Sequence, residues 1–163
     1  MGKITVSGTM SHSVDRVWSM LDDFGSVYLW SAGVESSPII GGTPERGVGA
    51  ERLCTLYDGN RISERVIESV DKRKLVVDIY DTTMPLKSAR GRFDLEGTSD
   101  GGTLVRMTFE YVVKYGILGK AMDALMIKRS LKKSLDNLLA ALDEHLATGV
   151  HIQKDWQPTT AAA

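Results

Sequence analysis

The sequence predicts an α+β fold in which an antiparallel sheet of about seven strands packs against one long C-terminal helix. Two observations carry this prediction. A segment near the C-terminus has helical periodicity, and the roughly hundred residues before it are short alternating segments separated by Gly, Pro, Asp and Asn. The length of 163 residues suits one domain with a single core, which we place at residues 1–149, followed by a tail at residues 150–163.

The predicted C-terminal helix runs from Ile117 to Leu146 and is apolar on one side. Gly149 follows it and supplies the residue type that commonly ends a helix. At about 1.5 Å per residue this helix spans on the order of 45 Å, so it needs a broad apolar surface to pack on. Its apolar face holds Ile117, Ala121, Ala124, Leu131, Leu135, Leu138, Leu139, Leu142 and Leu146.

The first strand is predicted at Lys3–Met10, where apolar and polar residues alternate. Two short helices are expected between this strand and the second one. Ser13 is a suitable N-cap for the first of them, and the second covers Val27–Trp30. The remaining predicted strands are Val34–Ile40, Val48–Tyr57, Arg61–Val70, Leu75–Asp81, Lys87–Glu96 and Thr103–Val113.

Alternation within these strands identifies the inner face of the sheet. In the last hairpin, Phe93 and Phe109 share one apolar face if the turn has an odd number of residues, as Asp100–Gly102 does. The residues that alternation assigns to the inner face are Val77, Ile79, Ala89, Phe93, Phe109 and Tyr111.

Glu64 is the residue whose position most needs an explanation. An odd turn at Asp58–Asn60 places Glu64 on the inner face, with Cys54 directly opposite and Arg52 diagonally across. A carboxylate on an apolar face is costly unless it is paired or solvated. Three interpretations stay open: an anchor for a ligand, a general acid or base, or one half of a structural ion pair with Arg52.

Small and flexible side chains at other positions indicate room for a ligand. Ala89 and Gly91 lie where a packed core would have larger residues, as do Ala121 and Ala124 on the helix. The alternative for Gly91 is that it only bends its strand. Met126, near the start of the helix, suits an adaptable lid or a partner contact, unless loops bury this part of the helix on both sides.

Composition excludes several classes of protein. Lys and Arg number 20 against 21 Asp and Glu, so the net charge of −1 gives no overall field for nucleic acid or an anionic membrane. The single cysteine, Cys54, cannot form an internal disulfide. Without a signal sequence or an apolar run long enough to span a bilayer, we expect a cytoplasmic protein with no integral membrane association. Without metal or nucleotide motifs, we expect no cofactor, and the sequence leaves the oligomeric state open.

Several segments, together with the order of the predicted elements, resemble a known family: VDRVWSMLDDF at 14–24, Trp30, VGAERLCTLYDGNRISERV at 48–66, Asp71 and the closing DNLLAALDEHL. They are similar to the START-like (SRPBCC) superfamily in its polyketide cyclase/dehydrase and lipid-transport branch. Plant abscisic acid receptors and birch-pollen-type allergens are more distant relatives.

The resemblance implies a helix-grip fold, in which a curved sheet wraps around the long helix and encloses an apolar cavity open at one end. It implies gating loops at Tyr57–Asn60 and Thr82–Leu86, and a Glu64 that faces the cavity and holds polar ligand groups. The gating sequences of the hormone receptors and the cluster ligands of the Rieske oxygenases do not occur here, which disfavours both activities.

The leading hypothesis is binding of a small hydrophobic molecule of lipid, polyketide or aromatic type. One alternative is a cyclase/dehydratase-like enzyme in which Glu64 is the acid or base; Glu64 is the one catalytic candidate. Another is a protein-interaction module of the chaperone-cofactor type that uses the outer face of the sheet. The predicted ligand-binding residues are Glu64, Arg52, Cys54, Leu56, Val77, Ile79, Ala89, Phe93, Phe109, Tyr111, Met126 and Leu131.

Overall fold

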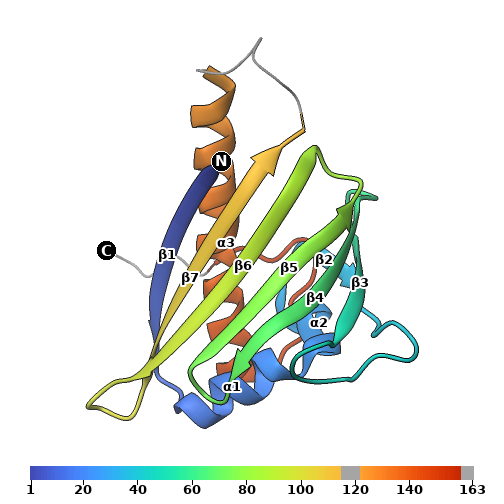
Figure 1. Ribbon diagram of the computed structural model, residues 1–163. Helices are drawn as coiled ribbons and strands as arrows, with labels where there is room; N and C mark the ends of the chain where they lie inside the picture. The colour runs from blue at the N-terminus through green and yellow to red at the C-terminus, as the bar shows by residue number, and fades with distance from the viewer. Residues whose placement is uncertain (115–121, 159–163) are drawn as a thin grey trace.

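The computed structural model describes residues 1–114 and 122–158. Its strands are β1 (Gly2–Met10), β2 (Val34–Ser36), β3 (Glu51–Leu56), β4 (Arg61–Val70), β5 (Lys74–Thr82), β6 (Leu86–Gly97) and β7 (Thr103–Val113). Its helices are α1 (Val14–Asp22), the single turn η1 (Phe24–Ser26), α2 (Val27–Trp30) and α3 (Met122–Thr148). Figure 1 shows these elements along the chain.

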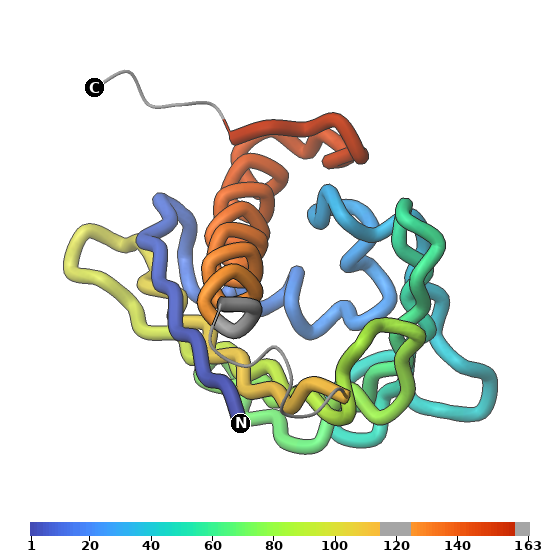
Figure 2. Tube along the Cα trace, turned by 90° about the horizontal axis from the view of Figure 1, so that it is seen from above, coloured from blue at the N-terminus to red at the C-terminus, as the bar shows by residue number. Residues whose placement is uncertain are grey.

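The seven strands form one antiparallel sheet in the order β1-β7-β6-β5-β4-β3-β2. Every strand from β2 to β7 pairs with its neighbour in sequence, and β1 pairs with β7. The sheet curves around α3, with α1 and α2 on the same concave side (Figures 1 and 2). The predicted α+β, helix-grip arrangement, with two short helices between the first two strands, is confirmed.

The second half of α3 forms part of the core, whereas its first turns do not. Leu135, Leu139, Leu142 and Leu146 are buried, and the helix packs on β1 and α2. Residues 125–130 are all exposed. The predicted helix start at Ile117 lies outside the described residues. None of the helices that the structure describes is both long enough and apolar enough to cross a bilayer.

Helix α1 closes one end of the space between the sheet and α3. The Ser13 hydroxyl accepts a hydrogen bond from the Arg16 amide at 3.4 Å, as an N-cap does. Val17, Trp18 and Leu21 point into the core. The Arg16 guanidinium donates to the carbonyl oxygen of Leu146 at 2.5 Å, so it satisfies a carbonyl group in the last turn of α3.

Two predicted strands are shorter than expected. β2 ends at Ser36 and not at Ile40, and β3 begins at Glu51 and not at Val48. Between them, Gly42, Gly47 and Gly49 have φ values of +87°, +71° and +91°. Ile39 still forms an isolated bridge with Arg52 on β3, but left-handed residues interrupt extended pairing after it, so residues 41–49 are a series of turns.

The predicted register of the β3–β4 hairpin is wrong by two residues. Arg52, and not Cys54, lies directly opposite Glu64. The turn closes one position earlier than predicted, because the Leu56 amide donates to the carbonyl of Asn60 at 2.8 Å and Gly59 takes the left-handed conformation. The turn still has an odd number of residues, so Glu64 stays on the inner face as predicted.

Residues that follow α3 pack against α2. Ile152 is buried, and its amide donates to the carbonyl of Leu29 in α2 at 2.8 Å. The ring of His151 forms an edge-to-face contact with Tyr28 at 5.6 Å between centroids. The first residues after Gly149 therefore pack against α2.

Candidate functional site

Arg52 and Glu64 form an ion pair on the inner face of the sheet. They are direct partners on β3 and β4, and Nε of Arg52 donates to Oε2 of Glu64 at 2.6 Å. Their side chains are 11% and 14% exposed, so both are largely desolvated. The ion pair that the sequence offered as one interpretation of Glu64 is therefore present.

Arg52 also connects the sheet to η1. Its NH1 donates to the Phe24 carbonyl oxygen at 2.7 Å, and its guanidinium carbon lies 4.0 Å from the centre of the Phe24 ring. Burial is the largest single influence and lowers the pKa of Arg52, but the charges of Glu64 and Cys54 and the hydrogen bonds to them together raise the pKa overall. Arg52 therefore stays charged and fixes the position of the carboxylate.

Cys54 is the second protein donor to Glu64. Its sulfur lies 3.3 Å from Oε2, the same oxygen that Arg52 contacts. Burial, followed by the charge of Glu64, raises the pKa of the Cys54 thiol, so the thiol keeps its proton and donates it. Among the described residues, no side-chain donor reaches Oε1 of Glu64, which leaves one carboxylate oxygen able to accept a hydrogen bond from a ligand.

The predicted site residues fall in cross-strand rows on the inner face. One row begins with Arg52 and Glu64, continues through Ile79 and Ala89, and ends at Tyr111 beside β1. Neighbouring strands lie about 4.8 Å apart, so Tyr111 is roughly 14 Å from Glu64. The adjacent row contains Val66, Val77, Gly91, Phe109 and Ile4.

There is unfilled space beside Gly91. This residue is buried, yet a Cβ atom built on it would have just one neighbouring atom within 4 Å, Cε of Met107 at 3.9 Å. Real core positions are usually surrounded more closely. The space supports the interpretation of Gly91 as a residue that leaves room on the inner face.

Aromatic rings occupy the β1 side of these rows. The rings of Phe109 and Tyr111 are stacked, with 6.0 Å between centroids. The Tyr111 ring lies directly over Gly2, where an added Cβ would come within 2.4 Å of it. Any residue larger than glycine at this position would displace the ring.

The two loops that the resemblance identified as gates are joined to each other. The hydroxyl of Thr83 accepts a hydrogen bond from the Arg61 amide and donates one to Oδ1 of Asn60, each at 2.9 Å. The Thr83 amide donates to the carbonyl of Arg61 at 3.1 Å. The loops therefore form one connected edge at the end of the sheet.

Not every predicted site residue lies in the cross-strand rows on the inner face. Met126 is 69% exposed on the first turns of α3, and Leu56 and Leu131 are partly buried at the edge of the core. Sequence reasoning did not predict a further feature, which involves Trp30 in α2. Its indole N–H is buried and, within the described residues, has no hydrogen-bond partner, and only the three-dimensional position of acceptors could have revealed this.

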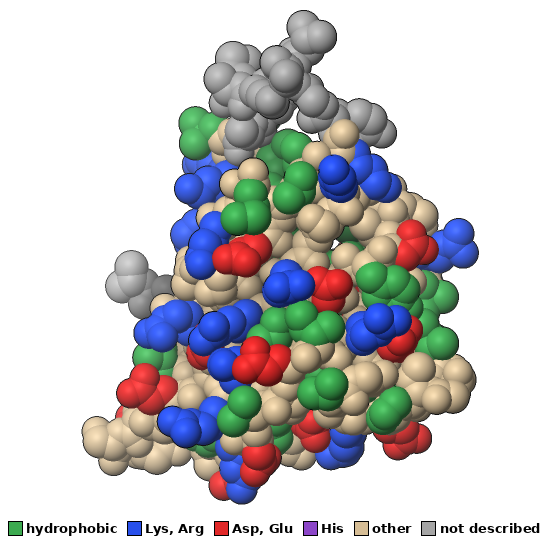
Figure 3. Space-filling model, viewed as in Figure 1, with side chains coloured by type: hydrophobic (Ala, Val, Ile, Leu, Met, Phe, Trp, Pro, Cys, Tyr) green, Lys and Arg blue, Asp and Glu red, His purple; other side chains and the backbone are tan. Residues whose placement is uncertain are grey.

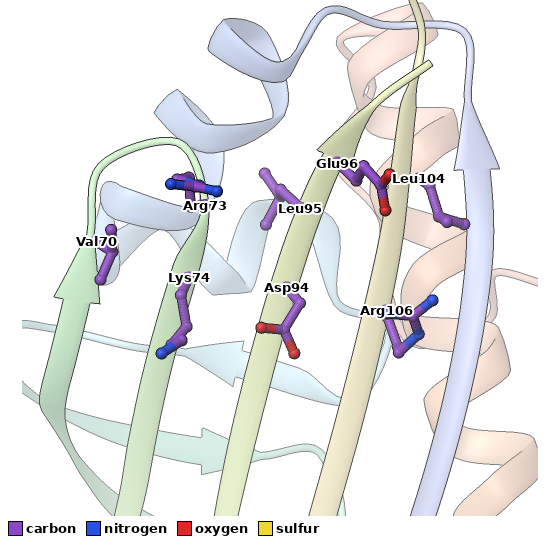
Figure 4. A pocket seen from close by; sticks show the side chains of 8 residues that line it. All are labelled: Val70, Arg73, Lys74, Asp94, Leu95, Glu96, Leu104 and Arg106. Carbon is purple, nitrogen blue, oxygen red and sulfur yellow. The ribbon is translucent and has the colours of Figure 1, made fainter.

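Two surface hollows lie elsewhere. The larger, about 350 Å³, is on the outer face of the sheet and is lined by Val70, Arg73, Lys74, Asp94, Leu95, Glu96, Leu104 and Arg106 (Figure 4). The smaller, about 160 Å³, lies near the start of β1 and includes Ala89 and Tyr111 among its lining residues. Neither includes Arg52 or Glu64.

Comparison with protein families matches residues 1–147 to the family described as polyketide cyclase / dehydrase and lipid transport. The chain belongs to this family. The match covers the sheet, both short helices and nearly all of α3, and it confirms the resemblance inferred from the sequence.

Solved structures share the fold of this chain. A START superfamily protein from Mycobacterium smegmatis has 14% identity and a TM-score of 0.75, with 91% of this chain and 99% of that chain covered. XoxI from Bacillus cereus has 23% identity and a TM-score of 0.68, with 91% and 97% covered. A protein of the dynemicin biosynthetic locus has 17% identity and a TM-score of 0.70, with 95% and 51% covered. At these identities the likeness shows the fold alone, and the comparison with curated proteins finds no match.

Proposed function

We propose that the protein binds a small hydrophobic molecule of lipid, polyketide or aromatic type between the inner face of the sheet and α3. The observation that carries this proposal is the hydrogen bonding of the Glu64 carboxylate. Two protein donors contact Oε2. Within the described residues no donor reaches Oε1, which can therefore accept a hydrogen bond from a ligand. The next two residues of its row, Ile79 and Ala89, are apolar.

Affinity would come mainly from burial of the ligand's apolar surface, at about 25 cal/mol per Å². Glu64 would orient one polar group, such as a hydroxyl or an amine, because an acceptor in an apolar site selects for a donor. Arg52 and Cys54 hold the carboxylate in place, so its orientation does not have to be fixed when the ligand binds.

The geometry gives less support to a cyclase or dehydratase. In the described part of the Glu64 row, the next side chain with an ionisable group on the far side is Tyr111, three strands away. A general acid and base must both reach the reacting atoms. Ligand binding needs only one polar group at the position of Glu64, whereas catalysis needs a second one beside it. Binding is therefore the better explanation of the Glu64 row.

Native mass spectrometry of freshly purified protein gives the first test. We expect an excess mass that disappears after denaturing extraction with organic solvent and that identifies the ligand's composition. Binding of the neutral fluorescent probe N-phenyl-1-naphthylamine gives a second readout that does not depend on a co-purified molecule.

Three variants connect these readouts to the inner face. Gly91→Leu fills the space beside Gly91 and should lower probe affinity at least about tenfold. Glu64→Gln keeps the side-chain volume and should lower it about fivefold or less, the equivalent of one hydrogen bond. Ser88→Leu adds the same side chain to an exposed position of the same strand and should leave binding unchanged. Equal binding by Gly91→Leu and the parent protein would show that the probe does not enter this space.

A further inference from the structure

The first turns of α3 expose large apolar side chains. Leu125 is 71% exposed and Met126 is 69% exposed, and the neighbouring Ile127 is also exposed. Residues 125–130 are exposed in succession, and at about 100° per residue six successive positions point in every direction around a helix. We call residues 125–133 the α3 tip.

The α3 tip is strongly basic. Lys128, Arg129, Lys132 and Lys133 are all exposed, and the segment has no acidic residue. Lys132 forms an ion pair with Asp136, which follows the tip, at 2.7 Å. Within the described residues, the other three basic side chains have no ion pair. Figure 3 shows hydrophobic side chains at the upper left of the molecule above a run of Lys and Arg side chains.

Apolar and basic side chains alternate over the surface of the tip. Residues three and four apart are neighbours on a helix, so Leu125 lies beside Lys128 and Arg129. Met126 lies next to Arg129 and on the same side of the helix as Lys133. Leu125 and Met126, the two most exposed of these apolar side chains, are therefore flanked by cations.

We propose that the α3 tip docks on the surface of an anionic lipid bilayer. Basic side chains contact the phosphate groups of the lipids, while apolar side chains enter the boundary between headgroups and acyl chains. The net charge of −1 for the whole chain does not oppose this docking, because four cations are concentrated in nine residues at one end of the molecule.

Other occupants fit the tip less well. A symmetric contact with a second copy would place the same four cations against each other, which is repulsive. A groove on a protein receives one stripe of side chains at a spacing of three or four residues. Leu125, Met126 and Ile127 are consecutive and project in three directions, which a fluid lipid interface accommodates.

The tip lies at the same end of the molecule as the connected 57–60 and 82–86 loops (Figure 1). If the proposed function holds, this is the end at which the ligand enters, so a docked molecule would exchange its ligand directly with the bilayer. Docking itself does not rest on the proposed function, since it requires only the tip.

Flotation with vesicles tests the proposal. We expect the full chain to float with phosphatidylcholine vesicles that contain about 30% phosphatidylglycerol and not with vesicles of phosphatidylcholine alone. Raising the salt from about 0.05 M to about 0.5 M should weaken binding, because it screens the charges. An absence of binding to the anionic vesicles at low salt would overturn the proposal.

Variants separate the two contributions. Lys128→Glu with Arg129→Glu should lower vesicle affinity at least about tenfold. Leu125→Ser with Met126→Ser should lower it about fivefold or more while the dependence on salt remains. Arg73→Glu with Arg106→Glu makes the same charge change on exposed residues of the outer sheet face and should bind like the parent protein.

An equal loss in this control, or no loss in either tip variant, would overturn the assignment to the tip. Thermal unfolding of each variant checks that it is folded. Binding of N-phenyl-1-naphthylamine should be the same in the variant with Lys128→Glu and Arg129→Glu as in the parent protein, so a failure of docking is distinguishable from a failure of the proposed cavity.

Discussion

Arg52 stabilises the fold and prepares the candidate site with the same side chain. It joins β3 to β4 through Glu64 and joins both strands to η1 through the carbonyl and the ring of Phe24. A buried ion pair gains stability only when its geometry and additional hydrogen bonds offset the loss of hydration. The contacts of Arg52 offset the loss of hydration. Within the described residues they leave Oε1 of Glu64 without a protein donor.

Removal of Arg52 alone should be costly. Arg52→Met leaves a largely buried carboxylate without its partner, and we expect the free energy of unfolding to fall by about 3 kcal/mol in urea titrations. Arg52→Met combined with Glu64→Leu should recover most of this loss. Arg65→Met, which removes an exposed ion pair with Glu51, should cost much less, because solvent screens that pair. Equal losses for the two single Arg variants would mean that the buried ion pair contributes no more to stability than the exposed one.

The face on which Glu64 lies could be predicted from the sequence, but its partner could not. The face depends only on whether the turn has an odd number of residues, and two different turns satisfy that condition. The register depends on which residue takes the left-handed conformation. Gly59 does so, and the turn closes one position earlier than predicted. Within the described residues, Oε1 of Glu64 and the indole N–H of Trp30 have no protein hydrogen-bond partner, and this depends on contacts between distant segments, which no local pattern encodes.

At the scale of elements, the end of the sheet near the α3 tip is organised by two joined loops. Thr83 connects them through both hydrogen-bonding functions of its hydroxyl. The resemblance suggested these loops as gates one by one. That the two loops are joined to each other is visible only in the structure, because the hydrogen bonds join residues that are 22 and 23 positions apart.

Thr83→Val should release the two loops from each other. The variant keeps the shape of the side chain but removes both hydrogen bonds, so we expect stability to fall by about 1 kcal/mol and amide exchange in residues 57–60 and 82–86 to accelerate. Hydrogen–deuterium exchange measured by mass spectrometry follows both segments. Thr108→Val, which removes one hydroxyl contact with Thr5 on the sheet, should leave exchange in the two loops unchanged. Slow exchange in both loops of the Thr83 variant would show that other contacts hold them.

The strands themselves were predictable to within a few residues wherever alternation is regular, as in β6 and β7. Prediction failed between β2 and β3, where glycines at positive φ form turns in a stretch that also contains apolar residues. Glycine permits either extended or left-handed backbone, and the surrounding fold selects one of them.

At the scale of the whole molecule, the chain is packed against the rest of the protein as far as Ile152. A boundary at residue 149 follows from the helix-ending glycine, which correctly marks where α3 stops. It does not mark where the core stops, because the chain turns back and buries Ile152 beside α2. The sequence of this short stretch is too brief for a periodic pattern to reveal such a contact.

Ile152→Ala should therefore lower stability as a core substitution does. We expect a loss of about 2 to 4 kcal/mol in the free energy of unfolding, measured by denaturant titration. Val150→Ala, at an exposed position two residues earlier, should change it by less than about 0.5 kcal/mol. A loss for Ile152→Ala as small as that of the control would place the end of the domain before residue 150.

The position of β1 in the sheet also determines when the fold can be completed during synthesis. β1 is made first, but its only partner in the sheet is β7, and the other element that packs on it is α3. On the ribosome, β2 to β6 can pair with their neighbours as they emerge, whereas β1 keeps one edge and its apolar side chains without native partners until β7 has left the exit tunnel. Final assembly thus waits for β7 and α3, and the nascent protein carries an open strand until both have been made.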